Sequence, residues 1–301
     1  MGCVMSVVLK SGVIVQKVSV SPSVAFGNHL PLGIIAGPCS IESRDMAMHI
    51  AHTMVSECGK LGIPYVFKAS FDKANRTSIH GVRGIGWEAA RAIFLEIKET
   101  YGCPVITDVH SPEQCAAVAQ VADILQIPAF LCRQTDLIMA AAKTGKTLNI
   151  KKGQFLSPQE MHTVVDKAVS AGNEKIMMCE RGTTFGYHLL VNDMRGLAIM
   201  GKNGYPVIFD ATHSVQRPGG KGNSSGGDRE CVELLARAAT AVGIAGLFLE
   251  THPNPDAAPS DGPNMVPLAH VGKMLAALSE MDRVTKSLSY QDFSLSAMPG
   301  P

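Results

Sequence analysis

The feature that most constrains the fold is a regular alternation between short apolar runs and longer stretches with helical periodicity. The apolar runs, which we expect to be strands, lie at residues 33–36, 65–67, 105–107, 123–126, 147–150, 175–179, 206–209 and 246–249. The helical stretches lie at residues 44–60, 87–100, 112–120, 135–144, 158–171, 190–201, 228–242 and 267–286. Alternation of this kind predicts a parallel sheet. Eight such units over roughly 250 residues predict a closed (β/α)8 barrel, the TIM barrel of the α/β class.

Polar side chains follow every expected strand. They are Cys39; Lys68 and Ser70; Asp108 and His110; Gln126; Lys151 and Lys152; Glu180 and Arg181; Asp210 and His213; and Glu250 and His252. Barrel enzymes build their sites from the carboxyl ends of their strands. An open doubly wound sheet is the alternative, but it would set these ends in a row, and the first expected strand is not followed by a G-x-G-x-x-G turn.

The composition indicates where in the cell the protein is found and which kinds of partner it lacks. The formal net charge is +1, so the chain carries no global basic field for nucleic acid. The eight cysteines are scattered without a C-x-x-C pair, which is typical of reduced intracellular thiols. No segment has the pattern of a secretion signal or a membrane span. We therefore expect a cytoplasmic protein without a membrane partner. A short N-terminal extension over 1–32, with a possible hairpin, would precede a barrel over 33–287 and a C-terminal tail over 288–301.

The segment from Lys68 to Ser78 is very polar, although an apolar strand leads into it. Lys68, Lys73 and Arg76, together with several hydroxyls, suit an oxygen-rich anion, above all phosphate. A solvated surface loop is the alternative.

Four candidate metal ligands follow the first, seventh and eighth strands, which a closed barrel makes neighbours. Cys39, His213, Glu250 and Asp261 would supply one thiolate, one imidazole and two carboxylates, a set that suits zinc or ferrous iron. Taken singly, a cysteine is more often a small buried apolar residue, and a histidine at a strand end often has no metal.

Further cations end other strands. Lys151 and Arg181 would point toward the same axis as Lys68 and could bind a small, highly charged anion. Internal salt bridges with Asp108, Glu180 and Asp210 are the alternative. Arg133 could reach this site or an adjoining subunit, or it could be a solvated residue at a helix start. The glycine-dense stretch 218–227 lacks P-loop spacing and could be a lid over the barrel mouth or a plain flexible loop.

Six motifs in order resemble one family closely. They are GPCSIES at 37–43, KASFDKANRTS at 68–78, QIPAFL at 126–131, KKGQF at 151–155, ERG at 180–182 and FDATHS at 209–214. Together they resemble the 3-deoxy-D-manno-octulosonate 8-phosphate synthases from about residue 33 to residue 285. The resemblance implies condensation of phosphoenolpyruvate with D-arabinose 5-phosphate, for lipopolysaccharide or cell-wall sugar synthesis, by a homotetramer.

The resemblance also implies roles for individual residues. Those implied to surround phosphoenolpyruvate are Lys68, Ser70, Gln126, Lys151, Arg181 and His213. Those implied to hold the arabinose phosphate are Lys73, Asn75, Arg76 and Thr77, with Arg133 reaching a neighbouring subunit. The implied catalytic set is Lys68, Asp108, His110, Lys151, His213 and Asp261.

The family divides by metal use, and its metal-independent members carry Asn where this chain has Cys39. The resemblance therefore implies a divalent metal (zinc, ferrous iron or manganese) held by Cys39, His213, Glu250 and Asp261. Two other functions stay open. One is the sister 3-deoxy-D-arabino-heptulosonate 7-phosphate synthase, which uses erythrose 4-phosphate, and the other is a sugar-phosphate-binding barrel without catalysis.

Overall fold

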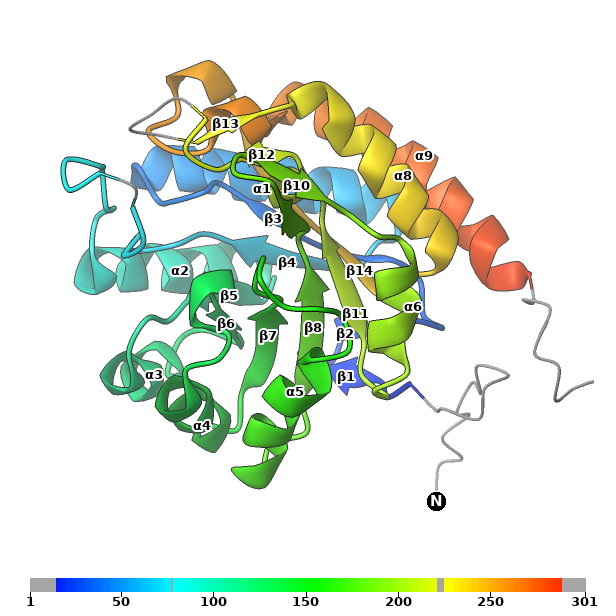
Figure 1. Cartoon of the computed structure of the whole chain (residues 1–301). Helices are drawn as coiled ribbons and strands as arrows, with labels where there is room; N and C mark the ends of the chain where they lie inside the picture. The colour runs from blue at the N-terminus through cyan, green and yellow to red at the C-terminus, as the bar shows by residue number, and fades with distance from the viewer. Residues whose placement is uncertain (1–14, 77, 221–224, 289–301) are drawn as a thin grey trace, which may run out of the picture.

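The structure is a computed structural model that describes residues 15–76, 78–220 and 225–288 (Figure 1). Its centre is a closed ring of eight parallel strands. They are β3 (Gly33–Gly37), β4 (Tyr65–Lys68), β5 (Val105–Asp108), β6 (Ile124–Ile127), β7 (Thr147–Lys151), β8 (Ile176–Glu180), β11 (Val207–Asp210) and β14 (Gly246–His252). Successive strands pair in order, and β14 pairs with both β11 and β3, which closes the ring. The predicted (β/α)8 barrel is confirmed.

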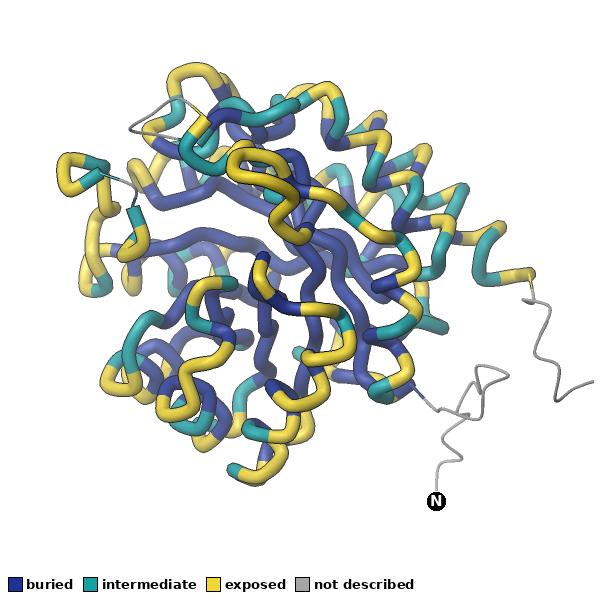
Figure 2. Tube along the Cα trace, in the orientation of Figure 1, coloured by how far each residue is buried: buried dark blue, intermediate teal, exposed yellow. Residues whose placement is uncertain are grey.

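Helices surround the ring. They are α1 (Arg44–Leu61), α2 (Trp87–Tyr101), α3 (Pro112–Val118), α4 (Thr135–Lys143), α5 (Met161–Ser170), α6 (Arg195–Gly201), the short α7 (Ala211–Ser214), α8 (Val232–Val242) and α9 (Leu268–Ser287). Short 3-10 helices are η1 (Ala129–Leu131), η2 (Arg229–Cys231), η3 (Pro255–Ala257) and η4 (Gly262–Asn264). In α2 the apolar residues Ala90, Phe94 and Ile97 share one face, and that face is buried. Figure 2 shows the barrel strands buried and the outer faces of the helices exposed. No helix in the described ranges is long and apolar enough to span a membrane.

The helix expected over 190–201 is wrong in its first part. There β9 (Thr183–Phe185) and β10 (Leu189–Val191) form an antiparallel hairpin, and α6 begins only at Arg195. Gly186, at a φ of 70°, supplies the left-handed turn between the strands. Burial alternates along β10, with only its middle residue buried, so the local period is that of a strand rather than a helix.

A second hairpin closes the amino-terminal end of the barrel. It pairs β1 (Val18–Ser19) with β2 (Ala25–Phe26). Phe26 packs among inward-facing barrel residues, and a Cβ atom at Gly33 or Gly246 would lie 2.5 or 2.8 Å from its ring. Glycine at the starts of these two strands therefore makes room for the Phe26 ring. The first part of the predicted extension, like the predicted C-terminal tail beyond 288, lies outside the described residues.

Longer connections rim the carboxyl-terminal end of the barrel. The chain leaves β14, passes through η3 and η4 and returns as β15 (Val266–Pro267), which pairs with β14. Beside it, β12 (Gln216–Arg217) pairs with β13 (Gly226–Gly227). Residues 221–224 of the glycine-dense stretch lie outside the described residues, so the lid stays a prediction.

Candidate active site

The carboxyl ends of the barrel strands surround a cavity of 740 Å³. The predicted site residues that line it are Lys68, Lys73, Asn75, Arg76, Asp108, His110, Gln126, Lys151, Arg181, His213 and Asp261. The closed barrel therefore brings to one cavity side chains that lie far apart in the sequence.

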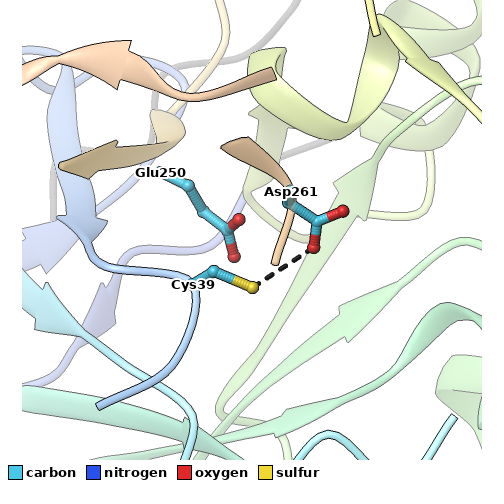
Figure 3. Close-up of side chains that lie close together, drawn as sticks. All are labelled: Cys39, Glu250 and Asp261. Carbon is cyan, nitrogen blue, oxygen red and sulfur yellow. Dashed lines mark hydrogen bonds between the residues drawn. The ribbon is translucent and has the colours of Figure 1, made fainter. Parts of the chain in front are cut away.

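Three of the four candidate metal ligands meet beside this cavity (Figure 3). Cys39 follows β3, Glu250 lies in β14, and Asp261 lies between β14 and β15; one ligand atom from each falls within 4.8 Å of the other two. The Cys39 thiol donates to Oδ2 of Asp261 at 3.2 Å. Nε2 of His213 lies 3.7 Å from Oε1 of Glu250 and 4.0 Å from Oδ2 of Asp261. The cluster thus has His213 at its edge.

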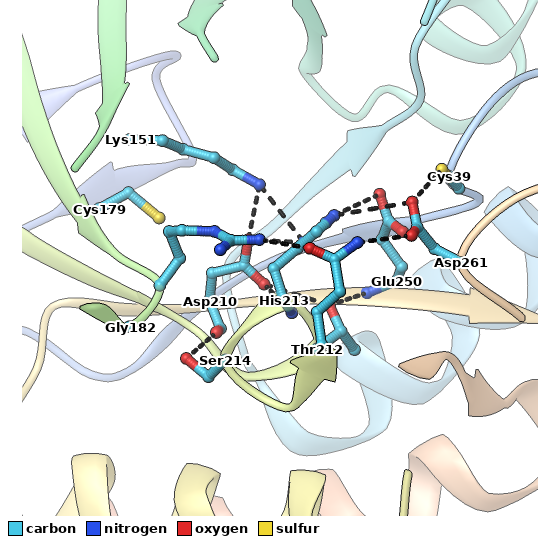
Figure 4. Close-up of polar contacts among 12 residues, drawn as sticks. Cys39, Lys151, Cys179, Gly182, Asp210, Thr212, His213, Ser214, Glu250 and Asp261 are labelled. Atoms are coloured by element: carbon cyan, nitrogen blue, oxygen red, sulfur yellow. Dashed lines mark hydrogen bonds and ion pairs between the residues drawn. The ribbon is translucent and has the colours of Figure 1, made fainter. Parts of the chain in front are cut away.

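Asp210 fixes the orientation of His213 (Figure 4). As the last residue of β11, Asp210 caps α7 by accepting the backbone N–H of His213 at 2.9 Å. Its Oδ2 lies 2.8 Å from Nδ1 of the same imidazole, so Nε2 faces Glu250 and Asp261. Burial alone would raise the pKa of Asp210, but His213 and Lys151 outweigh burial and hold the pKa well below its usual range. The residue that orients the imidazole is therefore a carboxylate at neutral pH.

The donor set fits a divalent cation. Oε2 of Glu250 is buried and has no hydrogen-bond partner among the described residues. Burial and the charge of Glu250 raise the pKa of the Cys39 thiol, so the sulfur keeps its proton unless positive charge enters the cluster. A metal ion would supply that charge, and one sulfur, one imidazole and two carboxylates are ligands that zinc or ferrous iron accepts.

Two buried lysines face the same aromatic ring. Lys68 donates to Glu250, and Lys151 donates to Oδ2 of Asp210 at 2.5 Å. Their Nζ atoms lie 5.5 and 3.9 Å from the centroid of the Phe248 ring in β14. The alternative of internal ion pairs therefore holds for Lys151, whereas Lys68 pairs with a carboxylate outside the expected set. Lys68 also donates to the carbonyl oxygens of Cys39 at 2.9 Å and Pro38 at 3.4 Å, so all three donors of its ammonium are engaged and it would act on a ligand mainly through its charge.

Arg181 differs from these lysines. Its side chain is buried, and within the described ranges it forms no ion pair with a carboxylate. Nη2 donates to Oε1 of Gln216 at 2.8 Å, while Nη1 is buried without a partner. Burial lowers the pKa of Arg181, but a guanidinium stays charged at neutral pH. Arg181 therefore offers an unused charged donor to an anion in the cavity.

Asp108 is the centre of a second polar network. It accepts from Ser70 Oγ and from Gln126 Nε2, each at 2.5 Å, and Gln126 accepts from Asn149 at 2.9 Å. Burial opposes ionisation, but Lys73 and Lys68 outweigh it and lower the pKa of Asp108. Asp108 is thus a second fixed carboxylate at the cavity wall.

Two of the predicted substrate-binding residues, Ser70 and Arg133, do not line the cavity in the described structure. Ser70 is fully buried behind the wall, where it supports Asp108. Arg133 is exposed just before α4, and its carbonyl accepts from Lys167. Thr77 lies outside the described residues. Their substrate-binding roles stay predictions.

The sequence did not reveal the two polar residues that hold Asp261. Gln216 and Ser260 line the cavity, and both donate to Asp261, at 2.8 and 3.0 Å. Neither belongs to a recognisable spacing pattern. Gln154, which also lines the cavity, lay within a motif but received no role.

Comparison with known proteins agrees with this geometry. The chain is 58% identical over 267 residues to a protein of Bartonella quintana (strain Toulouse), covering 89% of this chain and 96% of that protein. It is 61% identical over 264 residues to one of Rhodopseudomonas palustris (strain BisB5), covering 87% of this chain and 92% of the relative. Both relatives are named 2-dehydro-3-deoxyphosphooctonate aldolase. Residues 13–287 match the DAHP synthetase I family. With nearly the whole barrel matched and relatives this similar, the chain belongs to the DAHP synthetase I family.

Proposed function

We propose that this protein is a 3-deoxy-D-manno-octulosonate 8-phosphate synthase. It condenses phosphoenolpyruvate with D-arabinose 5-phosphate and water and releases inorganic phosphate. The observation that carries the proposal is that buried cations lining one cavity lie next to the thiol, imidazole and carboxylates of the candidate metal ligands. The names of the two relatives support the octulosonate product over the heptulosonate product.

Phosphoenolpyruvate carries a phosphate and a carboxylate, and the buried side of the cavity suits both. The ammonium groups of Lys68 and Lys151 both lie near the Phe248 ring, and Arg181 adds its free Nη1 donor. Such fixed charges hold an anion in the orientation for reaction without reorganisation when the substrate binds.

The aldose phosphate belongs nearer the mouth, beside the segment that follows β4. Lys73, Asn75 and Arg76 line the cavity there, and Nη2 of Arg76 is buried without a partner among the described residues. Lys73 lies 3.7 Å from Asp108 and 3.9 Å from Glu250. Its ammonium therefore lies close to both carboxylates, where it can contact a substrate bound in the cavity.

In the proposed reaction the methylene carbon of phosphoenolpyruvate attacks the aldehyde carbon, and the aldehyde oxygen takes a proton as its double bond to carbon opens. Water adds to the neighbouring pyruvyl carbon and gives up a proton, so the protons balance. The hemiketal phosphate then loses phosphate by cleavage of its carbon–oxygen bond. Lys68, Lys151 and Arg181 balance the charge of the phosphate and carboxylate throughout. His110 has a buried Nδ1 without a partner in the described ranges, and burial lowers its pKa, so it is neutral and can accept a proton from the water.

Cys39, His213, Glu250 and Asp261 would hold the metal ion, which we propose to be zinc, ferrous iron or manganese. When bound, the ion would supply Lewis acidity toward an oxygen atom of water or of the aldehyde. Asp210 would keep the imidazole in the tautomer that leaves Nε2 free for the ion.

We further propose that the enzyme is a cytoplasmic homotetramer, in which Arg133 contacts the sugar phosphate of a neighbouring subunit. The exposed position of Arg133 supports a role outside its own cavity. The product would supply lipopolysaccharide or cell-wall sugar synthesis.

Aldose specificity tests the proposed function. Phosphate release from phosphoenolpyruvate is measured with arabinose 5-phosphate and with erythrose 4-phosphate over a range of each. We expect kcat/KM to be at least tenfold higher for arabinose 5-phosphate, because the cavity must match the length of the aldose. Equal or higher kcat/KM with erythrose 4-phosphate would favour the heptulosonate synthase, and binding without phosphate release would favour a non-catalytic barrel.

A further inference from the structure

The carboxylate of Asp261 is held from two sides by residues that also contact arginines of the cavity. Its Oδ1 accepts from Gln216 Nε2 at 2.8 Å, and its Oδ2 accepts from Ser260 Oγ at 3.0 Å. The Cys39 thiol donates to Oδ2 as well. Asp261 therefore joins the metal cluster to two separate chains of hydrogen bonds.

The first chain leads to Arg181. Gln216 Oε1 accepts from Arg181 Nη2 at 2.8 Å while its Nε2 donates to Asp261. A cation needs the acceptor end of the carboxamide and a carboxylate needs the donor end, so the two partners fix one orientation of the amide. Because Nη1 of Arg181 has no partner within the described ranges, an anion can bind it without breaking the contact with Gln216.

The second chain of hydrogen bonds leads to Arg76, and here too one side chain accepts from an arginine and donates to Asp261. Ser260 Oγ accepts from Arg76 Nη1 and donates its one hydrogen to Asp261. Here it is Nη2 of Arg76 that is buried without a partner in the described structure. Each arginine therefore commits one nitrogen to a link with Asp261 and leaves another for a ligand.

Asp261 also has an unusual backbone. Its φ of 54° makes it the one non-glycine residue with positive φ in the described part of the chain. Left-handed backbone at a non-glycine residue is strained and persists where its surroundings hold it. The links from Gln216 and Ser260 are side-chain contacts that hold this residue.

We propose that Gln216 and Ser260 are positioning residues that couple metal occupancy at Asp261 to the two substrates by separate routes. Gln216 would connect the metal to phosphoenolpyruvate through Arg181, and Ser260 would connect it to the aldose phosphate through Arg76. An anion that immobilises either arginine also immobilises its link to Asp261, so the coupling is positive. This inference rests on the proposed function, which assigns the two substrates to these two arginines.

The test measures Mn²⁺ affinity of the full-length protein by competition with a chromophoric chelator. Each titration is run without substrate, with saturating phosphoenolpyruvate alone and with saturating arabinose 5-phosphate alone, so that no condensation occurs. For the unaltered protein we expect each substrate to tighten Mn²⁺ binding within the range of about 5- to 150-fold that is usual for coupled sites. By linkage, Mn²⁺ tightens binding of each substrate by the same factor.

Two substitutions should separate the routes, and each variant is the matched control for the other. In Gln216→Leu the effect of phosphoenolpyruvate should fall to about onefold while the effect of arabinose 5-phosphate persists. In Ser260→Ala the effect of arabinose 5-phosphate should fall to about onefold while the effect of phosphoenolpyruvate persists. Ser260→Thr keeps the hydroxyl and should keep both effects. Gln216→Glu keeps the acceptor for Arg181 but loses the donor to Asp261, so the effect of phosphoenolpyruvate on Mn²⁺ binding should also fall to about onefold. This variant provides the test if Gln216→Leu folds poorly.

The outcomes distinguish the inference from the proposed function. Mn²⁺ binding that no substrate alters, or variants that keep both effects, would overturn the coupling while leaving the metal site in place. Loss of both effects in Gln216→Leu would show general loosening of Asp261 and would overturn the separate routes. A protein that bound no Mn²⁺ under any condition would contradict the metal site of the proposed function and the coupling with it.

Discussion

Nδ1 of His213 lies 2.8 Å from Oδ2 of Asp210, and the opposite nitrogen of the imidazole faces Glu250 and Asp261. The same oxygen of Asp210 accepts from Lys151. One buried carboxylate therefore orients a candidate metal ligand and a candidate substrate cation together. This relationship links the two halves of the proposed site.

Asp210→Asn should weaken metal binding by about 10- to 100-fold, the usual effect of removing the partner of a ligating histidine. It should also raise KM for phosphoenolpyruvate, because Lys151 loses its counter-ion and its fixed position. Metal affinity by chelator competition and steady-state kinetics check both effects. The surface variant Asp193→Asn, whose carboxylate is 47% exposed and pairs with Arg195, is the control. Unchanged metal affinity in Asp210→Asn would contradict the orienting role.

Cys39→Ala should remove most of the activity, and Cys39→Asn should weaken its dependence on metal. Both variants lose the sulfur ligand. Alanine puts no polar group in its place, whereas asparagine supplies an amide. Co²⁺ loaded into the unaltered protein should show the absorption of a thiolate-bound ion, and that absorption should vanish in both variants. Cys58→Ala, which removes another buried thiol in α1, should leave the absorption unchanged. A Cys39→Ala protein with the original spectrum would rule out Cys39 as a ligand.

Gln126→Leu should lower the free energy of unfolding by about 1–3 kcal/mol for each polar group left buried without a partner. Asp108 would keep Ser70 but lose the donor to its Oδ1, and Asn149 would lose the acceptor of its amide. Chemical denaturation measures the loss. Gln114→Leu also removes a glutamine hydrogen bond, but that bond goes to the half-buried backbone N–H of His110, so its loss should be smaller. Equal losses in the two variants would show that the Asp108 network adds little stability.

The pKa of His110 should make stability fall at mildly acidic pH. Burial lowers this pKa below its ordinary value of 6.5, despite the opposing charge of Asp108. Between the folded-state pKa and 6.5 the unfolded chain binds more protons than the folded chain, so stability decreases as the pH falls through this window. The unaltered protein should therefore lose stability relative to His110→Gln as the pH drops below about 6.5. Denaturation at several pH values checks the sign, and a difference that is constant with pH would contradict it.

Most of the barrel could be predicted from sequence because its strands are buried on both faces. Runs such as 33–36 and 246–249 are apolar throughout, and the polar residue that ends each run marks the cavity. The β9–β10 hairpin was missed because its short apolar segment, next to a helix, fits either period. The exposed residues Leu189 and Val191 gave no sign that the chain pairs there with β9.

The site divides in the same way. Lys151 and Asp210 end strands, so barrel closure alone places them at one mouth. Asp261 lies in the long connection between β14 and β15, where no periodicity fixes its position, so its carboxylate and its place after the eighth strand made it a candidate ligand without placing it. Gln216 and Ser260 were missed because their importance lies in the partners they have in the folded chain. A role that depends on such contacts cannot be predicted from residue type or spacing.

Metal-dependent release of phosphate tests the central claim most directly. The protein is treated with a chelator, freed of it, and assayed with phosphoenolpyruvate and arabinose 5-phosphate before and after divalent metal is restored. We expect phosphate release to be lost in the metal-free protein and to return with added Mn²⁺, Zn²⁺ or Fe²⁺. Full phosphate release by protein shown to contain no metal would contradict the claim that Cys39, His213, Glu250 and Asp261 form a metal site required by this enzyme.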